Sequence, residues 1–259
     1  MTTLFLDADS LAYSIAAAHQ HEYKWSNDLW TYTGNMHGAR ISLREFVDEC
    51  LKVTGCTDVR VALSDSESNF RTRVLPTYKM NRVGSLRPLL YKAMREEMQQ
   101  NYGAVIEPHL EGDDLVSIWA TAPRADGIIC SIDKDLRTVP GRLYNPRKGE
   151  GVEEISGLEA SRFFYSQILA GDPVDGYSGC PGLGEKRTAQ LLEGFAEEID
   201  PWRAYVVPSY EAAGLSEKVA IQNARCAHLL RWNEYHVEGG VQRIDLWHPR
   251  GEGGQLIIG

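Results

Sequence analysis

Residues 3–9 read TLFLDAD, a short apolar run that ends in two aspartates. A run of this length is typical of a buried strand, so we expect a strand from Thr3 to Asp7. Asp9 sits where it could cap a helix that begins at Ser10. The stretch therefore predicts a strand that turns directly into a helix, with an acid at the turn.

The same pattern continues along the chain. We expect further strands at residues 58–64 (DVRVALS), 105–106 and 127–132 (GIICSI). Between and after them, apolar spacing predicts helices at residues 41–51, 86–102, from 112 onward, 156–170, 187–192 and 216–232, with Gly55 ending the first. Alternation of strands and helices indicates an α/β fold with a central, mostly parallel sheet flanked by helices.

Acidic residues follow the predicted strand ends repeatedly. The motifs are LDAD (6–9), LSD (63–65), LEGDD (110–114), SIDKD (131–135) and GDPVDGYSG (171–179). In open parallel sheets the carboxyl ends of the strands face a common crevice, so we expect these acids to converge. Besides Asp9, whose role the pattern leaves open, the candidates are Asp7, Asp65, Glu111, Asp113, Asp114, Asp133, Asp135, Asp172 and Asp175.

Such a cluster is severely repulsive unless cations neutralise it. Oxygen ligands suit hard divalent ions, and Mg²⁺ held by carboxylates, water and substrate phosphate is the expected one. No His or Cys has matching spacing, which disfavours zinc. For any one motif, a helix cap or a solvated loop acid is the alternative interpretation. That alternative weakens when the pattern recurs in five motifs.

The net charge of −9 at first argues against a nucleic-acid partner. Setting the nine candidate ligands aside from the 36 acids leaves 27, which equals the number of Lys plus Arg. The negative excess can therefore belong to one metal site. Charge is also uneven along the chain, because residues 68–95 contain seven bases and no acid.

The basic segment combines cations with aromatic side chains in FRTRVLPTYKMNR (70–82). We expect Lys79 and Arg82 to attract a phosphate, Arg71 to contact nucleic acid, and Tyr78 to stack on a nucleobase. The alternative is a solvated helix face, which a run of a single charge sign explains poorly.

A glycine-rich turn, GCPGLGEKRTA (179–189), precedes a predicted helix. Gly182 and Gly184 allow backbone N–H groups and a helix N-terminus to approach a phosphate, beside Lys186 and Arg187. This pattern is typical of the hairpin in a helix–hairpin–helix clamp on a DNA backbone. An ordinary helix start is the alternative interpretation.

Composition sets further bounds. No apolar run reaches the ~18 residues of a membrane-spanning helix. The N-terminus has no basic segment before its apolar run, so we expect no signal peptide and a cytoplasmic location. Five cysteines without CxxC spacing indicate a reducing compartment.

Taken in order, the LDAD, FRTRVLPTYKMNR, EGDD, SIDKD and GDPVDGYSGCPGLGEKRTA motifs resemble the 5′-nuclease (flap endonuclease) superfamily. Within it, the chain looks most like the replication 5′→3′ exonucleases of podovirus-type phages. The string ARCAHLLRWNEYHV (224–237) strengthens this resemblance, which covers residues 4–237.

The resemblance implies a PIN-like nuclease domain at residues 1–170, whose basic arch segment spans about 70–100. It implies a helix–three-turn–helix subdomain at 171–237 and leaves 238–259 as a Gly-rich tail, loose or forming a late hairpin. Two metal sites are implied, the first formed by Asp7, Asp65, Glu111, Asp113 and Asp114, and the second by Asp133, Asp135, Asp172 and Asp175. The implied ions are Mg²⁺, replaceable by Mn²⁺, and K⁺ at the glycine hairpin.

The implied activity is 5′→3′ hydrolysis of duplex DNA from 5′ ends, nicks or flaps, with RNA–DNA hybrids as further candidate substrates. Lys79 and Arg82 would contact the scissile phosphate, and the protein would act as a monomer in the host cytoplasm. The stretch from Arg82 to Glu111 is short for a closed helical arch, which favours a smaller or more open gateway.

Two other functions remain open at this point. LFLDAD and GDPVDG also fit a haloacid-dehalogenase-type phosphatase, with Asp7 as nucleophile and Asp9 as acid/base. That interpretation leaves EGDD, SIDKD, the basic run and the glycine turn unexplained. The other alternative is a non-catalytic module that binds DNA ends, which the complete set of acids disfavours.

Overall fold

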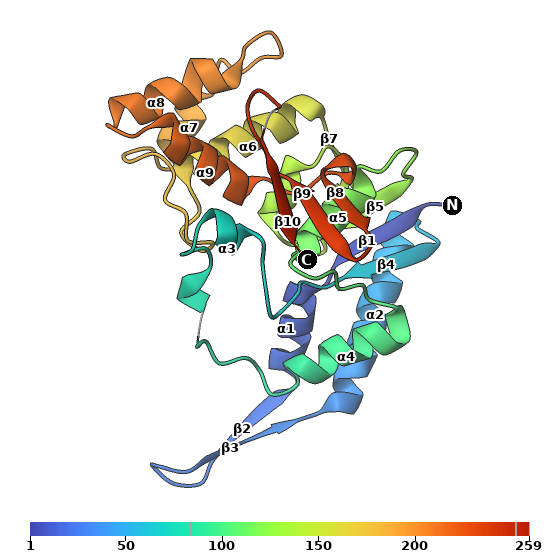
Figure 1. The fold of residues 1–259 in the computed structure, drawn as a ribbon. Helices are drawn as coiled ribbons and strands as arrows, with labels where there is room; N and C mark the ends of the chain where they lie inside the picture. The colour runs from blue at the N-terminus through green and yellow to red at the C-terminus, as the bar shows by residue number, and fades with distance from the viewer. Residues whose placement is uncertain (83, 252, 259) are drawn as a thin grey trace.

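The computed structural model describes residues 1–82, 84–251 and 253–258. Figure 1 shows a central sheet with helices packed around it, a group of helices at one end and a long hairpin at the opposite end.

The main sheet has the strand order β4–β1–β5–β6–β7. Its strands are β1 (Thr3–Asp7), β4 (Asp58–Ala62), β5 (Gly127–Cys130), β6 (Gly141–Tyr144) and β7 (Glu153–Ile155). All neighbours pair in parallel except β6 and β7, which are antiparallel. The predicted α/β class and mostly parallel sheet are therefore confirmed.

Both faces of the sheet are covered. Leu4, Leu6 and Val61 point into one core, which α1 (Asp9–Ala18), α2 (Met36–Thr54) and α4 (Tyr91–Tyr102) complete. Phe5 and Ile129 point into a second core, formed with α5 (Gly112–Ala120). Burial on both faces explains why the strands read as continuous apolar runs.

A third core lies in the helical part drawn from yellow to orange in Figure 1. It is built by α6 (Gly157–Ala170), α7 (Glu185–Leu191), the π-helical turn η3 (Trp202–Val206), α8 (Val207–Ala212) and α9 (Glu217–Ala227). The short elements α3 (Arg71–Val74), η1 (Met80–Arg82), η2 (Lys134–Thr138) and η4 (Trp232–Glu234) connect these parts. Tyr78 contributes to the third core, so the basic segment docks against the helices.

Several predicted boundaries shift for physical reasons. The helix expected at 86–102 begins only at Tyr91, since the chain around Pro88 is not helical. The helix expected at 216–232 ends at Ala227, and the strand expected at 105–106 is a single bridge between Val105 and Ala62. The helix over 156–170 has Ser156 as its N-cap.

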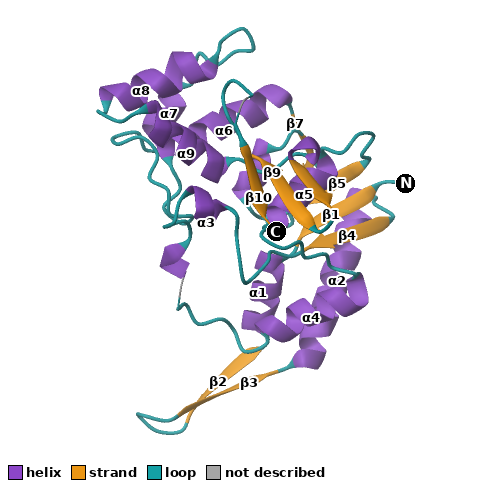
Figure 2. Cartoon of the chain, in the orientation of Figure 1, coloured by secondary structure: helices purple, strands orange, loops and turns teal. Residues whose placement is uncertain are grey.

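The C-terminal residues are not a loose tail. Strands β8 (Tyr235–Glu238), β9 (Val241–Asp245) and β10 (Gln255–Ile258) form an antiparallel sheet in the order β10–β9–β8. Ile244 and Ile258 are buried in the second core. This sheet and α5 lie on the same side of the main sheet, as Figure 2 shows.

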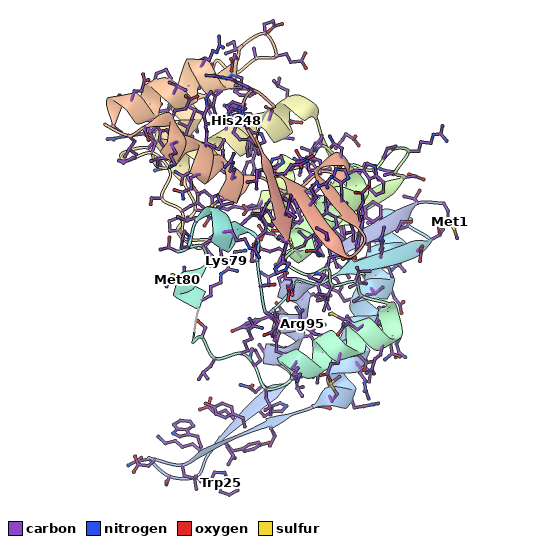
Figure 3. All side chains as sticks on the ribbon, viewed as in Figure 1. Met1, Trp25, Lys79, Met80, Arg95 and His248 are labelled. Carbon is purple, nitrogen blue, oxygen red and sulfur yellow. The ribbon has the colours of Figure 1, made fainter. Side chains whose placement is uncertain are left out.

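A hairpin that we did not predict extends from the body of the molecule. Strands β2 (Gln20–Lys24) and β3 (Trp30–Gly34) pair antiparallel, and nearly all their side chains are exposed. Trp25 marks its far end in Figure 3, well away from Lys79 and Arg95.

Within the residues that the structure describes, no helix is long and apolar enough to span a membrane.

Candidate active site

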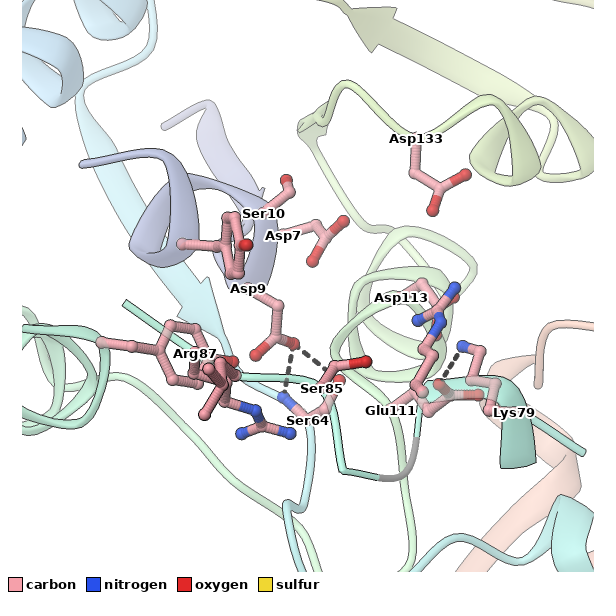
Figure 4. Close-up of a pocket in the computed structure, with 14 residues that line it drawn as sticks. Asp7, Asp9, Ser10, Ser64, Lys79, Ser85, Arg87, Glu111, Asp113 and Asp133 are labelled. Carbon is pink, nitrogen blue, oxygen red and sulfur yellow. Dashed lines mark hydrogen bonds and ion pairs between the residues drawn. The ribbon is translucent and has the colours of Figure 1, made fainter. Parts of the chain in front are cut away.

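An acidic pocket of about 450 Å³ opens at the carboxyl end of the main sheet. Asp7 enters it from the end of β1, Glu111 and Asp113 from the start of α5, and Asp133 from the loop after β5. Lys79 and Arg82 line the same pocket, together with Ser85 and Arg87 (Figure 4). The structure thus brings four predicted ligands and both predicted phosphate-binding bases together.

Asp7 is held in a surrounding that disfavours its charged form. Burial raises its pKa to about 7, and the negative charges of Asp9 and Asp133 add to this effect. Ser131 donates a hydrogen bond of 2.9 Å to Asp7 and fixes its orientation. A carboxyl with so high a pKa in a polar pocket is one that a cation would ionise.

The start of α5 holds a closely coupled pair. Lys79 forms an ion pair with Glu111, and this attraction, together with that of Arg71, outweighs burial and lowers the pKa of Glu111 to about 2. Burial and the adjacent charge of Glu111 raise the pKa of Asp113. Glu111 is therefore already neutralised by Lys79, whereas the adjacent Asp113 forms no ion pair within the described residues.

Lys79 adopts an unusual backbone conformation, with φ of 53°. Its N–H donates to the carbonyl oxygen of Asp175 at 2.9 Å, and a Cβ on Gly176 would lie 3.0 Å from the Thr77 carbonyl oxygen. The loop after α6 therefore packs tightly on the basic segment and fixes this conformation. Backbone strain of this kind is common where a functional side chain must be aimed.

Asp175 connects the basic segment to the second group of acids. It pairs with Arg82 at 2.7 Å and with Lys79 at 3.4 Å. Burial raises its pKa despite these bases, with repulsion from Glu111 contributing. Asp175 is thus the main partner of Arg82 and a second partner of Lys79.

Of the second group of acids only Asp133 lines the pocket, whereas Asp135, Asp172 and Asp175 do not. Burial and the charges of Asp133 and Asp175 raise the pKa of Asp135 to about 7. Asp172 is buried, accepts backbone N–H groups within its own turn, and pairs with Lys134 at 3.3 Å.

The structure corrects the sequence predictions for two residues, Arg71 and Tyr78, because both are buried. Arg71 was expected to contact nucleic acid, but it is 1% exposed. It donates to both oxygens of Asp114 at 2.6 and 2.8 Å and to the carbonyl oxygen of His228. Asp114 lies close enough to Glu111 and Asp113 to share a cation, and both of its oxygens also accept hydrogen bonds from Arg71.

Tyr78 is also corrected. Its ring is buried in the third core, so it cannot stack on a nucleobase. Its hydroxyl lies 2.9 Å from Glu111 and 3.0 Å from Asp175, and it fixes two carboxylates.

Asp65 and Asp9 occupy an adjoining hollow of about 620 Å³. Contrary to prediction, Asp65 does not line the acidic pocket, because its oxygens accept hydrogen bonds from Ser68 and from the backbone of Glu67 and His109. Asp9 lines both spaces and is held by Ser64 and by an ion pair with Arg95.

Sequence reasoning missed three residues of the site. Ser131 orients Asp7, Arg95 neutralises Asp9, and Arg87 lines the pocket rim. Ser131 belongs to the quoted SIDKD motif, so its position before two acids was a usable signal. Nothing in the sequence distinguishes Arg95 from its exposed neighbours in the basic run.

The glycine turn packs against α6. A Cβ on Gly179 would lie 2.3 Å from the backbone nitrogen of Gly171, so the two chain segments cross in direct contact. Gly184 precedes the first residue of α7, and the α7 side chains of Lys186 and Arg187 are exposed. Arg187 donates to the carbonyl oxygen of Gly182 at 3.0 Å and so closes the turn.

These features are similar to those of the 5′-nuclease superfamily, and comparison with known proteins supports the predicted resemblance. No family model matches the chain. In sequence it is 26% identical to the exodeoxyribonuclease of Enterobacteria phage T3 and 26% identical to the exonuclease of Escherichia phage T7. Each alignment covers 95% of this chain and 93% of the relative.

Other comparisons agree on the fold. The chain is 27% identical to the flap endonuclease Xni of Shewanella oneidensis, over 74% of each protein. Among solved structures it resembles the bacteriophage T5 D15 flap endonuclease, which was determined with DNA and metal ions. That match has a TM-score of 0.66 at 15% identity and covers 88% of this chain and 89% of the other.

Proposed function

We propose that this chain is a Mg²⁺-dependent 5′→3′ exonuclease that hydrolyses phosphodiester bonds from the 5′ ends of duplex DNA. The observation that carries the proposal is the acidic pocket, in which Asp7, Glu111, Asp113 and Asp133 converge beside Lys79 and Arg82. The names of the phage relatives support the same activity.

The donor set fits divalent cations. The raised pKa values of Asp7, Asp113, Asp135 and Asp175 show more carboxylates than the neighbouring bases can neutralise. All are oxygen donors, which suit Mg²⁺ or Mn²⁺. We propose that Asp7, Glu111 and Asp113 hold one ion, and that the second is held by Asp133, Asp135, Asp172 and Asp175.

When bound, a pair of divalent ions supplies an activated water and charge stabilisation for in-line displacement at phosphorus. Lys79 and Arg82 provide fixed positive charge toward the scissile phosphate. In the structure their charges are engaged by Glu111 and Asp175. Cations bound to those acids would release both side chains for the phosphate. Until then, the ion pairs with Glu111 and Asp175 hold the two bases in the pocket.

The chain at residues 84–90, which has no helix, supplies Ser85, Leu86 and Arg87 to the pocket wall. We propose that this short strap forms an open gateway for a 5′ end in place of a helical arch. The terminal nucleotide must unpair to reach the carboxylates, at a cost of a few kcal/mol. Nicks, flaps and RNA–DNA hybrids are further proposed substrates.

Exposed Lys186 and Arg187 on α7 are proposed to contact the duplex backbone beside Gly182 and Gly184. We also propose a K⁺ ion at this turn, which predicts weaker duplex binding when choline replaces K⁺. The protein is proposed to act as a monomer in the host cytoplasm, an inference supported by its phage relatives.

The phosphatase alternative loses support from the geometry of Asp9. That carboxylate is held by Ser64 and paired with Arg95, so it is not free to act as an acid/base. The non-catalytic alternative would gain support from a pocket without strand-end acids, whereas this pocket holds Asp7, Glu111, Asp113 and Asp133.

The test is a Mg²⁺ titration on 5′-labelled blunt, nicked and flapped duplexes with wild type and Asp133→Ala. Asp133 is exposed and makes no ion pair among the described residues, so its replacement should leave the fold intact. We expect release of labelled mononucleotides or short oligomers by wild type and its loss in the variant, with duplex binding retained. Full activity of Asp133→Ala would overturn the metal assignment.

A further inference from the structure

Gln167 is a buried amide in an apolar stretch of α6. It is 6% exposed and lies between residues that build the third core, among them Phe164 and Ile168. Its Nε2 donates to Asp135 at 2.5 Å. Its Oε1 is buried and has no hydrogen-bond partner within the described residues.

Tyr177 presents a second unpartnered group to the same acids. Its backbone pairs with Asp172 in a β-bridge, which fixes the ring in the loop after α6. The side chain is 2% exposed, and its hydroxyl has no hydrogen-bond partner among the described residues. The bridge holds Tyr177 beside Asp172, in the loop that also carries Asp175.

An unsatisfied buried polar atom costs about 1–3 kcal/mol, so two beside one carboxylate cluster require an explanation. Leucine and phenylalanine would fill the same volumes in this core without that cost. A hydrated cation offers water hydrogens to an amide oxygen, and its carboxylate ligands offer acceptors to a phenol. Both orphaned atoms would then be satisfied at once.

We propose that Gln167 and Tyr177 are positioning residues for the cation held by Asp133, Asp135, Asp172 and Asp175. Gln167 orients Asp135 through its amide N–H, while its carbonyl oxygen accepts a hydrogen bond from a water on that cation. Once the cation is bound, the hydroxyl of Tyr177, which has no partner among the described residues, would donate its hydrogen to one of the ligating carboxylates. The inference rests on the metal site of the proposed function and extends it to two residues behind the ligands.

The experiment measures Mn²⁺ binding without DNA, by the electron paramagnetic resonance signal of the free ion. The variants are Gln167→Leu and Tyr177→Phe. Gln242→Leu is the matched control, because Gln242 is 7% exposed and also has an unpartnered Oε1, but lies in β9. We expect one of the two Mn²⁺ affinities to fall about 10–100-fold in Gln167→Leu and several-fold in Tyr177→Phe, with no change in the control.

Thermal unfolding separates positioning from simple packing. With metal removed by EDTA, Tyr177→Phe should unfold at or above the wild-type temperature, because an orphaned hydroxyl is lost. Its stabilisation by Mn²⁺ should be smaller than in wild type. A structural role alone gives the reverse, a lower metal-free unfolding temperature and an unchanged Mn²⁺ effect, and would overturn the inference.

A buried water joining Gln167 and Tyr177 is the competing explanation, and it predicts wild-type Mn²⁺ affinities in both variants. That outcome would refute the positioning role and leave the proposed nuclease intact. If wild type itself binds no Mn²⁺ at millimolar concentration, the metal site of the proposed function fails instead. The two failures are thus distinguishable in one titration.

Discussion

Lys79 stands where the acids of the main sheet meet the basic segment. Its backbone has positive φ, and its amino group is divided between Glu111 and Asp175. A side chain held in this way is arranged before substrate arrives, which is how electrostatic stabilisation becomes effective without reorganisation.

Replacing Lys79 by Ala should therefore lower kcat about 10²–10³-fold, the effect of removing one fixed stabilising group. Affinity for Mg²⁺ should be unchanged or higher, because Glu111 and Asp175 lose a competing cation. Single-turnover cleavage and Mg²⁺ titrations check the two effects separately. The control is Lys52→Ala, an exposed lysine on α2 paired only with Glu49; a Lys79→Ala enzyme as fast as this control would contradict the role.

Arg71 should behave as a structural residue. Arg71→Ala leaves Asp114 buried without a counter-charge, which costs about 3–5 kcal/mol of unfolding free energy. Arg73→Ala, in the same motif but exposed, should change stability by less than about 0.5 kcal/mol. Urea denaturation measures both. A stable Arg71→Ala protein that has lost only DNA binding would restore the role first predicted from the sequence.

The raised pKa of Asp7 makes the metal-free protein less stable as pH rises. Its folded-state pKa of about 7 exceeds the ordinary value of 3.8, so the folded state keeps a proton that the unfolded state has released. The free energy of unfolding should fall as pH increases from about 4 to 7 and then level off.

Between pH 5 and pH 8 in EDTA we expect a loss on the order of 2 kcal/mol from this group. Asp7→Asn should reduce the pH dependence and be the more stable protein at pH 8. Urea denaturation of both proteins at the two pH values is the measurement. Equal pH profiles for wild type and Asp7→Asn would show that Asp7 ionises normally.

At the scale of elements, the β2–β3 hairpin is separate from the three cores. Its aromatic side chains are exposed, and its contacts with the body are at its base, where Gln20 accepts from the backbone N–H of Leu89 and Gly34 packs on Leu90. Removal of its outer part takes no side chain out of the apolar interior.

A variant in which residues 22–32 are replaced by a short Gly-rich turn should unfold within about 2 °C of wild type, since surface changes alter stability little. Leu43→Ala, in the first core, serves as the comparison and should cost about 2–5 kcal/mol. Calorimetry provides both values. Loss of cooperative unfolding on hairpin replacement would mean that the hairpin supports the fold.

The sequence predicted those elements whose patterns are determined by burial. The strands β1 and β5 are buried on both faces and read as apolar runs, and the α6 cap was visible at Ser156. The hairpin has no buried face, so no apolar period marks it. In β9, the alternate residues Gln242 and Ile244 are buried. The glycines on either side of this strand make the segment read as a loop, so the alternation is not recognisable from the sequence.

Within the site, the sequence predicted which acids lie close together better than it predicted what each residue does. Parallel strands end at one edge, so acids after β1 and β5 had to meet there. Whether a basic or aromatic residue in residues 70–82 points outward depends on the third core, which the local pattern does not show. For this reason Arg71 and Tyr78 were assigned to nucleic acid although both are buried.

For the whole molecule, the net charge of −9 and a nucleic-acid substrate are compatible because the charge is concentrated. The acids gather at one end of the main sheet, between the helical part and the strap that carries Arg87. A nucleic-acid strand therefore approaches negative charge mainly at the acidic pocket, where divalent cations are expected to bind.

The account depends on cations occupying this pocket, and the most direct measurement is an anomalous difference map from crystals soaked in Mn²⁺. We predict two peaks, one among Asp7, Glu111 and Asp113 and one among Asp133, Asp135, Asp172 and Asp175. Absence of any peak in the pocket at saturating Mn²⁺ would contradict the central claim.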